Sequence, residues 1–323
     1  EITLDAHPFT GEFQWDSNFQ ISFNRNTLKA LSGTTAASIV GYGQWSDVVC
    51  VSEIGKPLYN FYGYVVEGVY ESLEDIENSP KTAKHPENGV YNRSNTVWVG
   101  DLKYKDVNED GKIDEQDRTD IGSPLPKFTF GFNNTFRYKG FDLNIFLNGS
   151  YGNKVLNYSL MNGPSGGLAS MRSAWVNQNA TAIKDRAQLV PIDPDKVYES
   201  GSWYDDITNV KVANSGTKTP RPTLSDPNDN DRLSTRYIED GSYLRIKNIT
   251  LGYTFPKKWM QKAHFDNIRV YCNIQNLYTF TKYSGYDPEV GASTQDSSGY
   301  AYGVDNGRYP SPTTYSFGVS LTF

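Results

Sequence analysis

Residues 106–117, "DVNEDGKIDEQD", carry oxygen-bearing side chains at the spacing of an EF-hand type calcium loop. Gly111 occupies the sixth position, where such a loop turns sharply, and Ile113 at the eighth position is an apolar anchor. Calcium takes six to eight oxygen ligands, and odd-numbered spacing directs successive side chains toward one centre. The sequence therefore predicts a structural calcium site, with magnesium as the alternative cation. Its ligands would be Asp106, Asn108, Asp110, Lys112 through its backbone carbonyl, Asp114 and Asp117.

Two features of this loop limit what the ion would do. Asp117 replaces the longer glutamate of the usual loop, so we expect it to bind through one oxygen and with modest affinity. No amphipathic helix pair flanks the loop, which favours a structural ion over a calcium sensor. The alternative is a surface turn rich in Asp, Asn and Gly that holds no ion.

Composition narrows the possible functions of the 323-residue chain. The net charge is −6, and no cluster of Lys and Arg indicates nucleic acid. Cys50 and Cys272 are expected to be two unbonded small side chains rather than a disulfide. No apolar run is long enough for a transmembrane helix. No catalytic set stands out, and Asp205 and Asp206 are expected to solvate a loop, so the chain is not expected to be an enzyme.

Alternation of apolar and polar residues predicts an all-β fold. In "KFTFGFNNTFRY" the aromatic side chains fall on even positions, and in "FDLNIFLNGSY" the apolar side chains fall on odd positions. Only Lys139 and Gly140 separate these segments, which predicts a two-residue hairpin turn. The strands run about ten residues, longer than the usual five or six of soluble sheets. Further strands are predicted at 13–24, 243–255, 268–280 and 315–323.

One apolar and one polar face on long antiparallel strands fits a soluble sandwich or a transmembrane barrel. Aromatic residues crowd the strand ends, as in the girdles of membrane barrels. If the turn at Lys139–Gly140 is periplasmic, the long segments 152–242 and 281–312 both become extracellular, as does the metal loop. Residues 25–57 do not fit this pattern: they would be a long periplasmic connection unless they hold another hairpin. The pattern therefore favours a transmembrane β-barrel with long extracellular loops.

Five longer segments follow one another in a specific order and spacing: "IGKPLYNFYGYVVEGVY", "GDLKYKDVNEDGKIDEQDRTDIGSPLPKFTFGFNNTFRYKGFDLNIFLNGSYGNKV", "DGSYLRIKNITLGYTFP", "IRVYCNIQNLYTFTKYSGYDPEV" and "TTYSFGVSLTF". Together these segments resemble the C-terminal portion of SusC/RagA-like TonB-dependent outer-membrane transporters of the Bacteroidota. The chain also ends on an aromatic residue, Phe323, which is similar to the assembly signal of outer-membrane barrels.

The resemblance implies a plugged barrel of about 22 strands. Roughly eight strands can be identified here, too few for such a barrel, so residues 1–323 are expected to form its C-terminal part. The N-terminal plug and the TonB box would then lie outside this chain. The location would be the outer membrane, in contact with its lipid, with the C-terminus periplasmic.

The function implied by the resemblance is active import of oligosaccharides or peptides, without cleavage of the substrate. A SusD-like lipoprotein would cap the extracellular mouth, and TonB–ExbB–ExbD would act through the absent N-terminal part. Trp175, Trp203 and Tyr204 could stack on sugar rings or peptide side chains, or simply pack the loops. Two other functions stay open: a secreted, calcium-stabilised β-rich binding module and a passive outer-membrane porin. The sequence does not separate glycan from peptide as the substrate.

Overall fold

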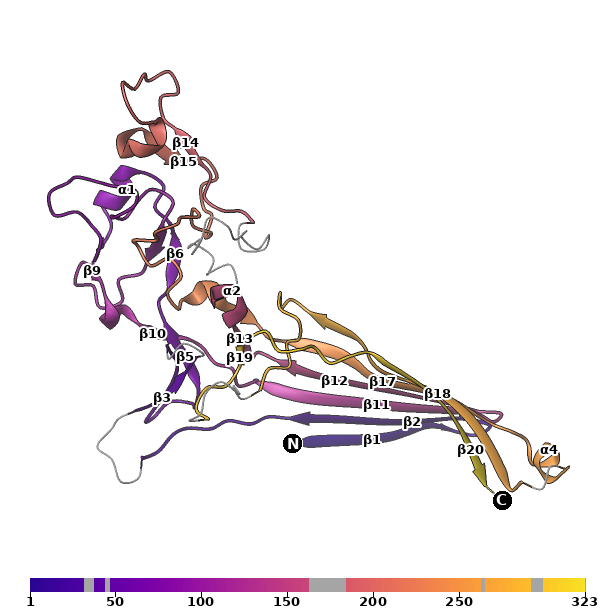
Figure 1. Cartoon of the computed structure of the whole chain (residues 1–323). Coiled ribbons are helices and arrows are strands. Elements are labelled where there is room, and N and C mark those ends of the chain that lie inside the picture. Colours follow the sequence, from indigo (N-terminus) through magenta and orange to yellow (C-terminus); the bar gives the residue numbers. More distant parts are fainter. Residues whose placement is uncertain (32–37, 44–46, 163–183, 263–264, 292–298, 323) are drawn as a thin grey trace.

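The main element of the chain is a long, twisted, antiparallel sheet (Figure 1). A computed structural model describes residues 1–31, 38–43, 47–162, 184–262, 265–291 and 299–322. Within these residues the sheet has seven strands, and β1 and β20 are its two open edges. The strands, in spatial order, are β1 (Ile2–Thr10), β2 (Phe13–Ser22), β11 (Phe128–Tyr138), β12 (Phe141–Tyr151), β17 (Tyr243–Thr254), β18 (Asn267–Thr281) and β20 (Thr314–Thr322).

The predicted hairpin between β11 and β12 is confirmed. Lys139 and Gly140 both adopt left-handed backbone angles, with φ of 47° and 89°. A two-residue turn of this kind matches the twist of the flanking strands and fixes their register. Tyr138 therefore pairs with Phe141, and the pairing runs without a shift to Phe128 and Tyr151.

Strand β17 contains a bulge that the alternation pattern did not predict. The register shifts between Ile246 and Asn248 in the pairing with β18, and beside Ile246 in the pairing with β12. The extra residue, Lys247, moves the apolar positions along β17 from even numbers before the bulge to odd numbers after it. Ile246 and Ile249 are thereby both paired with apolar residues of β12, and the apolar face stays continuous across the bulge.

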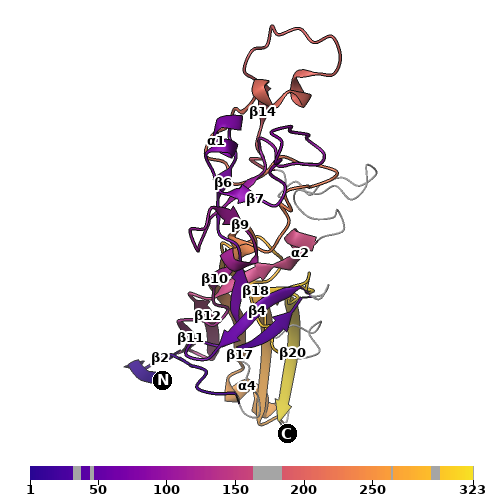
Figure 2. The same ribbon diagram turned by 90° about the vertical axis from the view of Figure 1, so that its left-hand side faces the viewer.

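The remaining elements form a folded lobe beyond one end of the sheet (Figures 1 and 2). A four-stranded sheet in the order β10-β5-β4-β3 lies where the lobe meets the long strands. Its strands are β3 (Ser38–Tyr42), β4 (Val48–Glu53), β5 (Asn60–Gly63) and β10 (Thr119–Gly122). The other strands are β6 (Val66–Val69), β7 (Lys81–Thr82), β8 (Leu102–Tyr104), β9 (Lys112–Ile113), β13 (Lys154–Asn157), β14 (Leu189–Pro191), β15 (Val210–Val212), β16 (Ile238–Asp240) and β19 (Val304–Asp305).

Helices are few and short among the described residues. Helices α1 (Leu73–Glu77) and α2 (Tyr158–Asn162) belong to the lobe, whereas α4 (Lys257–Lys262) lies at the opposite end of the long sheet. Ser72 caps α1 by accepting a hydrogen bond from the Asp75 backbone N–H. None of the described helices has the length and hydropathy required to cross a membrane.

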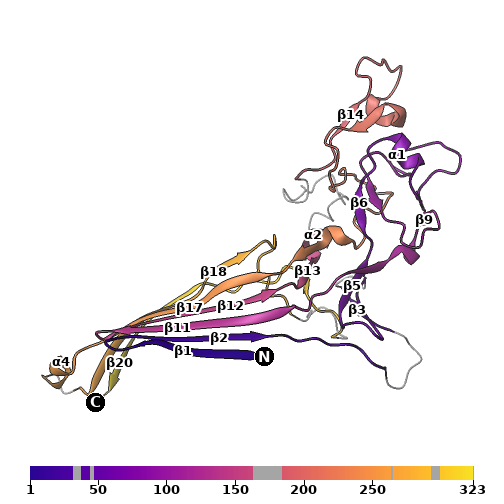
Figure 3. The ribbon, with the colours of Figure 1, turned by 180° about the vertical axis from the view of Figure 1, so that it is seen from behind.

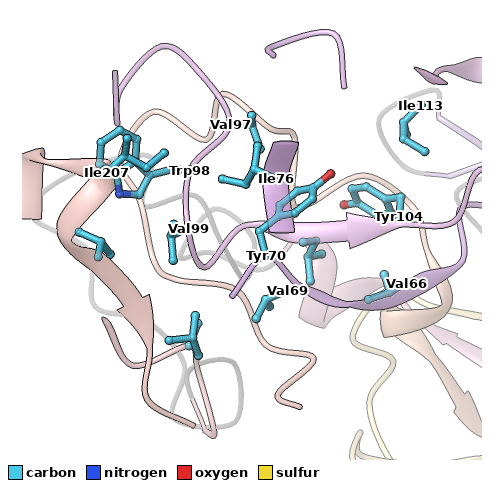
Figure 4. Packing of buried hydrophobic residues seen from close by; sticks show 14 of the residues in the cluster. Val66, Val69, Tyr70, Ile76, Val97, Trp98, Val99, Tyr104, Ile113 and Ile207 are labelled. Atoms are coloured by element: carbon cyan, nitrogen blue, oxygen red, sulfur yellow. The ribbon is translucent and has the colours of Figure 1, made fainter. Parts of the chain in front are cut away.

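The lobe has its own hydrophobic core (Figure 4). Tyr70, Trp98 and Tyr104 are at most 1% exposed, and Ile207 packs against them from a distant part of the chain. A second core joins β4 and β5 to α2 and β19. The described parts of the long connections are therefore folded structure rather than open loops.

A buried ion pair crosslinks segments of the lobe that are far apart in the sequence. Arg221 Nε lies 2.8 Å from Asp101 Oδ1, and both side chains are almost inaccessible to water. The Asn230 amide donates a further hydrogen bond to Asp101 at 3.2 Å. Burial raises the pKa of Asp101, while the guanidinium of Arg221 acts in the opposite direction.

Of the two possibilities for residues 25–57, a long connection or another hairpin, the structure shows the hairpin. This segment contains the hairpin of β3 and β4, and it lies in the lobe with the other long connections. Strand β2 runs antiparallel to β11, so the chain leaves β2 at the lobe end of the sheet. The expected absence of a disulfide agrees with the structure, since Cys50 is in β4 of the lobe and Cys272 is in β18, and they are not bonded to each other.

Candidate functional site

One face of the long sheet is a continuous apolar surface. Paired residues from adjacent strands form apolar rows across it, such as Phe19, Phe132 and Leu147. Large side chains on this face are strongly exposed: Phe317 is 81% accessible and Val319 is 64% accessible. A soluble sheet would cover such a face with a second layer, and the described residues supply none. The surface is suited to contact with hydrocarbon.

Aromatic rings gather at both ends of this apolar face. At the hairpin end, Phe13 and Trp15 stack on Phe136 with ring centroids 6.3 and 5.7 Å apart. At the lobe end, Phe128 stacks on Tyr151 at 5.1 Å. Aromatic bands at both ends of an apolar face are the arrangement expected at the two interfaces of a bilayer.

Asn134 is a polar residue on the apolar face. Its side chain is 8% exposed, and its amide oxygen accepts a hydrogen bond from Trp15 Nε1 at 2.9 Å. An unpaired amide in hydrocarbon would cost several kcal/mol. The indole of Trp15 therefore supplies the donor that water would supply on a soluble protein.

The opposite face of the sheet is polar and rich in amides. Asn144 donates to Asn133 and Thr135, at 2.8 and 2.9 Å, and Asn273 donates to Asn248 at 2.6 Å. Ion pairs flank these amides: Arg137–Asp16 and Arg269–Asp142 near the hairpin end, and Arg245–Asp287 near the lobe. A hollow of about 500 Å³ lies in this face, lined by Asn18, Gln20, Gly131, Asn133, Asn144, Phe146 and Asn248.

The predicted substrate residues lie at the distal part of the lobe. Trp203 packs partly buried against the lobe core, and its ring meets Tyr204 at 5.4 Å. Arg93 stacks over the Tyr204 ring at 4.2 Å and pairs with Asp205 at 3.2 Å. Trp203 and Tyr204 thus have structural partners, and their role toward a substrate stays a prediction. Trp175 lies outside the described residues.

The neighbouring carboxylates are engaged in holding the loop together. Asp206 accepts hydrogen bonds from Lys196 at 2.6 Å, Tyr198 at 3.1 Å and the Thr208 hydroxyl at 2.7 Å. The bond from Lys196, followed by that from Thr208, lowers the pKa of Asp206 to about 2. Asp205 and Asp206 have separate partners, so they do not form an acid/base pair.

The loop at 106–117 has the predicted backbone shape. Gly111 has a φ of 81°, and the Asp106 carboxylate accepts hydrogen bonds from the backbone N–H groups of Glu109 and Gly111 at 2.7 and 2.8 Å. Ile113 is 3% exposed and belongs to the lobe core, as expected of the anchor. Strand β9, which contains it, pairs with β7.

The C-terminal half of the loop is closed by carboxylates that accept from the backbone. Asp114 caps a single 3-10 turn by accepting from the Gln116 N–H at 2.8 Å. Asp117 is fully buried and accepts from the N–H groups of Val107 and Asp114, each at 2.8 Å. In the described part of the chain, no group of three or more His, Cys, Asp or Glu side chains is arranged to hold a metal ion. The ion itself therefore stays a prediction.

Comparison with known proteins adds independent information. No protein-family profile matches the chain. The TonB-dependent receptor P3 of Formosa agariphila is 30% identical over 332 residues, covering 100% of this chain and 28% of that receptor. The TonB-dependent receptor SusC of Bacteroides thetaiotaomicron is 25% identical, covering 100% of this chain and 26% of SusC. The structure of the RagAB peptide transporter matches with a TM-score of 0.66 and 18% identity, over 99% of this chain and 28% of that one.

The two-faced sheet and these matches identify the chain as TonB-dependent receptor sequence. Within that class the chain is SusC/RagA-like, as its sequence segments predicted. The chain spans about 28% of the length of the receptor P3. The names of these proteins describe receptors and a transporter and none describes an enzyme, which agrees with the expected lack of catalysis.

Substituting two neighbouring residues, one at a time, tests which face of the sheet meets lipid. Phe19 and Gln20 are adjacent in the middle of β2 and point to opposite faces. Phe19→Arg should lower the free energy of unfolding by about 2–4 kcal/mol, because a charge near the bilayer midplane is costly. Gln20→Arg, on the polar face, should change it little. Abundance of the full-length receptor in outer-membrane fractions is the measurement, and equal loss in both variants would contradict the assignment of faces.

Proposed function

We propose that residues 1–323 form the C-terminal part of a plugged barrel of about 22 strands in the bacterial outer membrane. The open edges of β1 and β20 support this proposal, because unpaired backbone groups cannot face hydrocarbon. Further strands of the same receptor would pair with both edges. The share of each relative that the chain covers leaves room for those strands, a plug and a TonB box.

The proposed activity is TonB-dependent import of a nutrient oligomer, either an oligosaccharide or a peptide. The observation that carries it is the combination of a lipid-suited sheet with a folded lobe at one end, in a chain that is SusC/RagA-like along its whole length. Energy would reach the barrel from TonB–ExbB–ExbD through the plug. The substrate would pass along the polar, amide-rich face of the sheet.

In the proposed orientation the lobe is extracellular. The Lys139–Gly140 turn, α4 and the end of β20 would then be periplasmic. A SusD-like lipoprotein would bind over the lobe, whose ordered cores provide a fixed surface for a lid. A secreted binding module fits less well, because its apolar sheet face would stand in water.

Cysteine labelling tests the orientation. Val197 in the lobe is 90% exposed and Lys258 in α4 is also exposed. On intact cells, a membrane-impermeant maleimide should label Val197→Cys and should label Lys258→Cys only after the outer membrane is permeabilised. The wild-type receptor, with Cys50 and Cys272 in place, provides the background. Labelling of Lys258→Cys alone on intact cells would show the reverse orientation.

Uptake by living cells tests the activity. Deleting the gene for the full receptor should abolish accumulation of the cognate labelled oligopeptide or oligosaccharide, and the full-length gene should restore it. Deleting TonB should abolish the same uptake, since the energy comes from the inner membrane. Uptake that survives loss of TonB would instead indicate a passive porin. Supplying peptides and oligosaccharides in parallel identifies the substrate class.

We also propose that the 106–117 loop binds one structural calcium ion, with magnesium as the alternative. The proposal is supported by the turn at Gly111 and by the burial of Ile113, which hold the loop in the expected shape. The Asp106 and Asp117 carboxylates accept hydrogen bonds from backbone N–H groups of the loop, which fixes their position. Each carboxylate oxygen retains a second lone pair for a cation. Asn108 and the Lys112 carbonyl would add uncharged oxygen ligands.

Calcium titration of the full receptor tests this site. Wild type should bind calcium at the loop, and Asp106→Ala with Asp110→Ala should remove that binding, because two carboxylate ligands are lost. Glu109→Ala is the matched control, since Glu109 stands between ligand positions. In wild type, calcium should slow hydrogen exchange over 106–117 relative to a chelator. If calcium slows exchange equally in the double variant, or in neither protein, the site is wrong.

A further inference from the structure

The turn between β17 and β18 carries an exposed tryptophan beside two lysines. Helix α4 follows Pro256, whose carbonyl accepts a hydrogen bond from the Trp259 N–H at 2.9 Å. Trp259 is 63% exposed, and Lys257 and Lys258 are also exposed. Figure 3 shows α4 at the tip of the sheet, on the side opposite to the lobe. The lobe core is too far away to bury this large aromatic side chain, so most of its surface is open to contact from outside the described residues.

Trp259 is connected to the apolar face of the sheet by an unbroken series of aromatic contacts. Phe141 meets Tyr253 with centroids 4.6 Å apart, Tyr253 meets Phe255 at 5.1 Å, and Phe255 meets Trp259 at 6.3 Å. Tyr253 pairs across the sheet with Phe141 and Val270, so the series begins on the apolar rows. The tryptophan therefore extends the membrane-facing surface past the last backbone pairing of the strands.

Lysines outnumber acidic residues in this turn, which has Lys257, Lys258 and Lys262 against Asp266. In the part of the chain that the structure describes, neither Lys257 nor Lys258 takes part in an ion pair. A further lysine, Lys139, lies in a neighbouring turn at the same end of the sheet, with its ammonium 5.0 Å from the centroid of the Tyr138 ring. Its contact with Glu12, at 3.6 Å, lies at the surface. The tip thus combines aromatic rings with ammonium groups that have spare hydrogen-bond donors.

We propose that the α4 turn is a binding site for phospholipid headgroups. The Trp259 ring lies at the level of the glycerol backbone, where an apolar body and a polar N–H are both accommodated. Lys257 and Lys258 extend into the headgroup layer and donate hydrogen bonds to phosphate oxygens. The site anchors the turn at the membrane surface and limits movement of β17 and β18 along the membrane normal. This inference rests on the proposed membrane location of the sheet.

Fluorescence quenching by brominated phospholipids tests the position of Trp259. The full receptor is reconstituted in vesicles of phosphatidylethanolamine and phosphatidylglycerol. The emission of Trp259 is obtained by subtracting the emission of the Trp259→Phe variant from that of the wild type. Bromine near the headgroup should quench this emission more strongly than bromine near the bilayer centre. The Trp203→Phe difference is the control, because Trp203 packs in the lobe and should be quenched by neither lipid. Quenching of Trp259 by aqueous acrylamide but by neither lipid would overturn the proposal.

Lipid retention tests the lysines. Native mass spectrometry of the receptor should show preferential retention of phosphatidylglycerol over phosphatidylcholine. Lys257→Gln with Lys258→Gln should reduce that preference by about five-fold for each lysine, the factor expected for one basic residue near an anionic surface. Lys211→Gln, an exposed lysine of β15 in the lobe, should leave it unchanged. If wild type, the double variant and Lys211→Gln all retain phosphatidylglycerol with the same preference, the role of the two lysines is contradicted.

A tryptophan placed on the sheet separates failure of this site from failure of the membrane assignment. Phe317→Trp introduces a reporter on the exposed apolar face of β20. If lipid bromine quenches this reporter but not Trp259, the sheet is in the membrane and the α4 turn faces another occupant, such as another part of the receptor. If lipid bromine quenches neither, the membrane assignment itself is wrong.

Discussion

The hydrogen bonding of one long antiparallel sheet constrains the rest of this structure. In hydrocarbon every backbone N–H and C=O must be paired within the protein. The five inner strands of the described sheet are paired on both sides, only the outer edges of β1 and β20 are open, and the Lys139–Gly140 turn sets the register between β11 and β12. Once the register is fixed, alternate side chains must face opposite sides. The apolar and amide-rich faces both follow from that pairing.

The apolar face is interrupted at two points, the bulge in β17 and Asn134, and neighbouring residues correct each interruption. The bulge at Lys247 would turn the apolar residues of β17 toward the polar side if the strand had no other change. The sequence changes phase at the same point, so Ile246 and Ile249 both face outward. Asn134 breaks the pattern in composition rather than in register, and the indole N–H of Trp15 satisfies its amide oxygen. Position-specific partners thus keep the apolar face intact where the periodicity alone would break it.

The sequence predicted the long strands well because their signal is local and repeats every second residue. The β11–β12 hairpin and the turn at Gly111 each depend on a few adjacent residues, and the structure has both. The lobe was harder, because β3 and β4 are short and show no clear alternation, so the sequence left open whether residues 25–57 form a hairpin or a connection. The Asp101–Arg221 pair joins residues that are 120 positions apart, a contact that no local pattern indicates. Trp203 was identified by its residue type, but its packing against the lobe core depends on that same distant folding.

Ion pairs between the sheet and the connection after β18 hold that connection in place. Arg245, in β17, is 2% exposed and lies 2.5 Å from Asp287 and 2.8 Å from Glu289 in the connection that follows β18. Asp287 also accepts hydrogen bonds from the backbone N–H groups of Glu289 and Ser311. Removing one partner of a buried pair leaves an uncompensated charge, which costs about 3–5 kcal/mol. The connection is therefore held against the polar face of the sheet near the lobe.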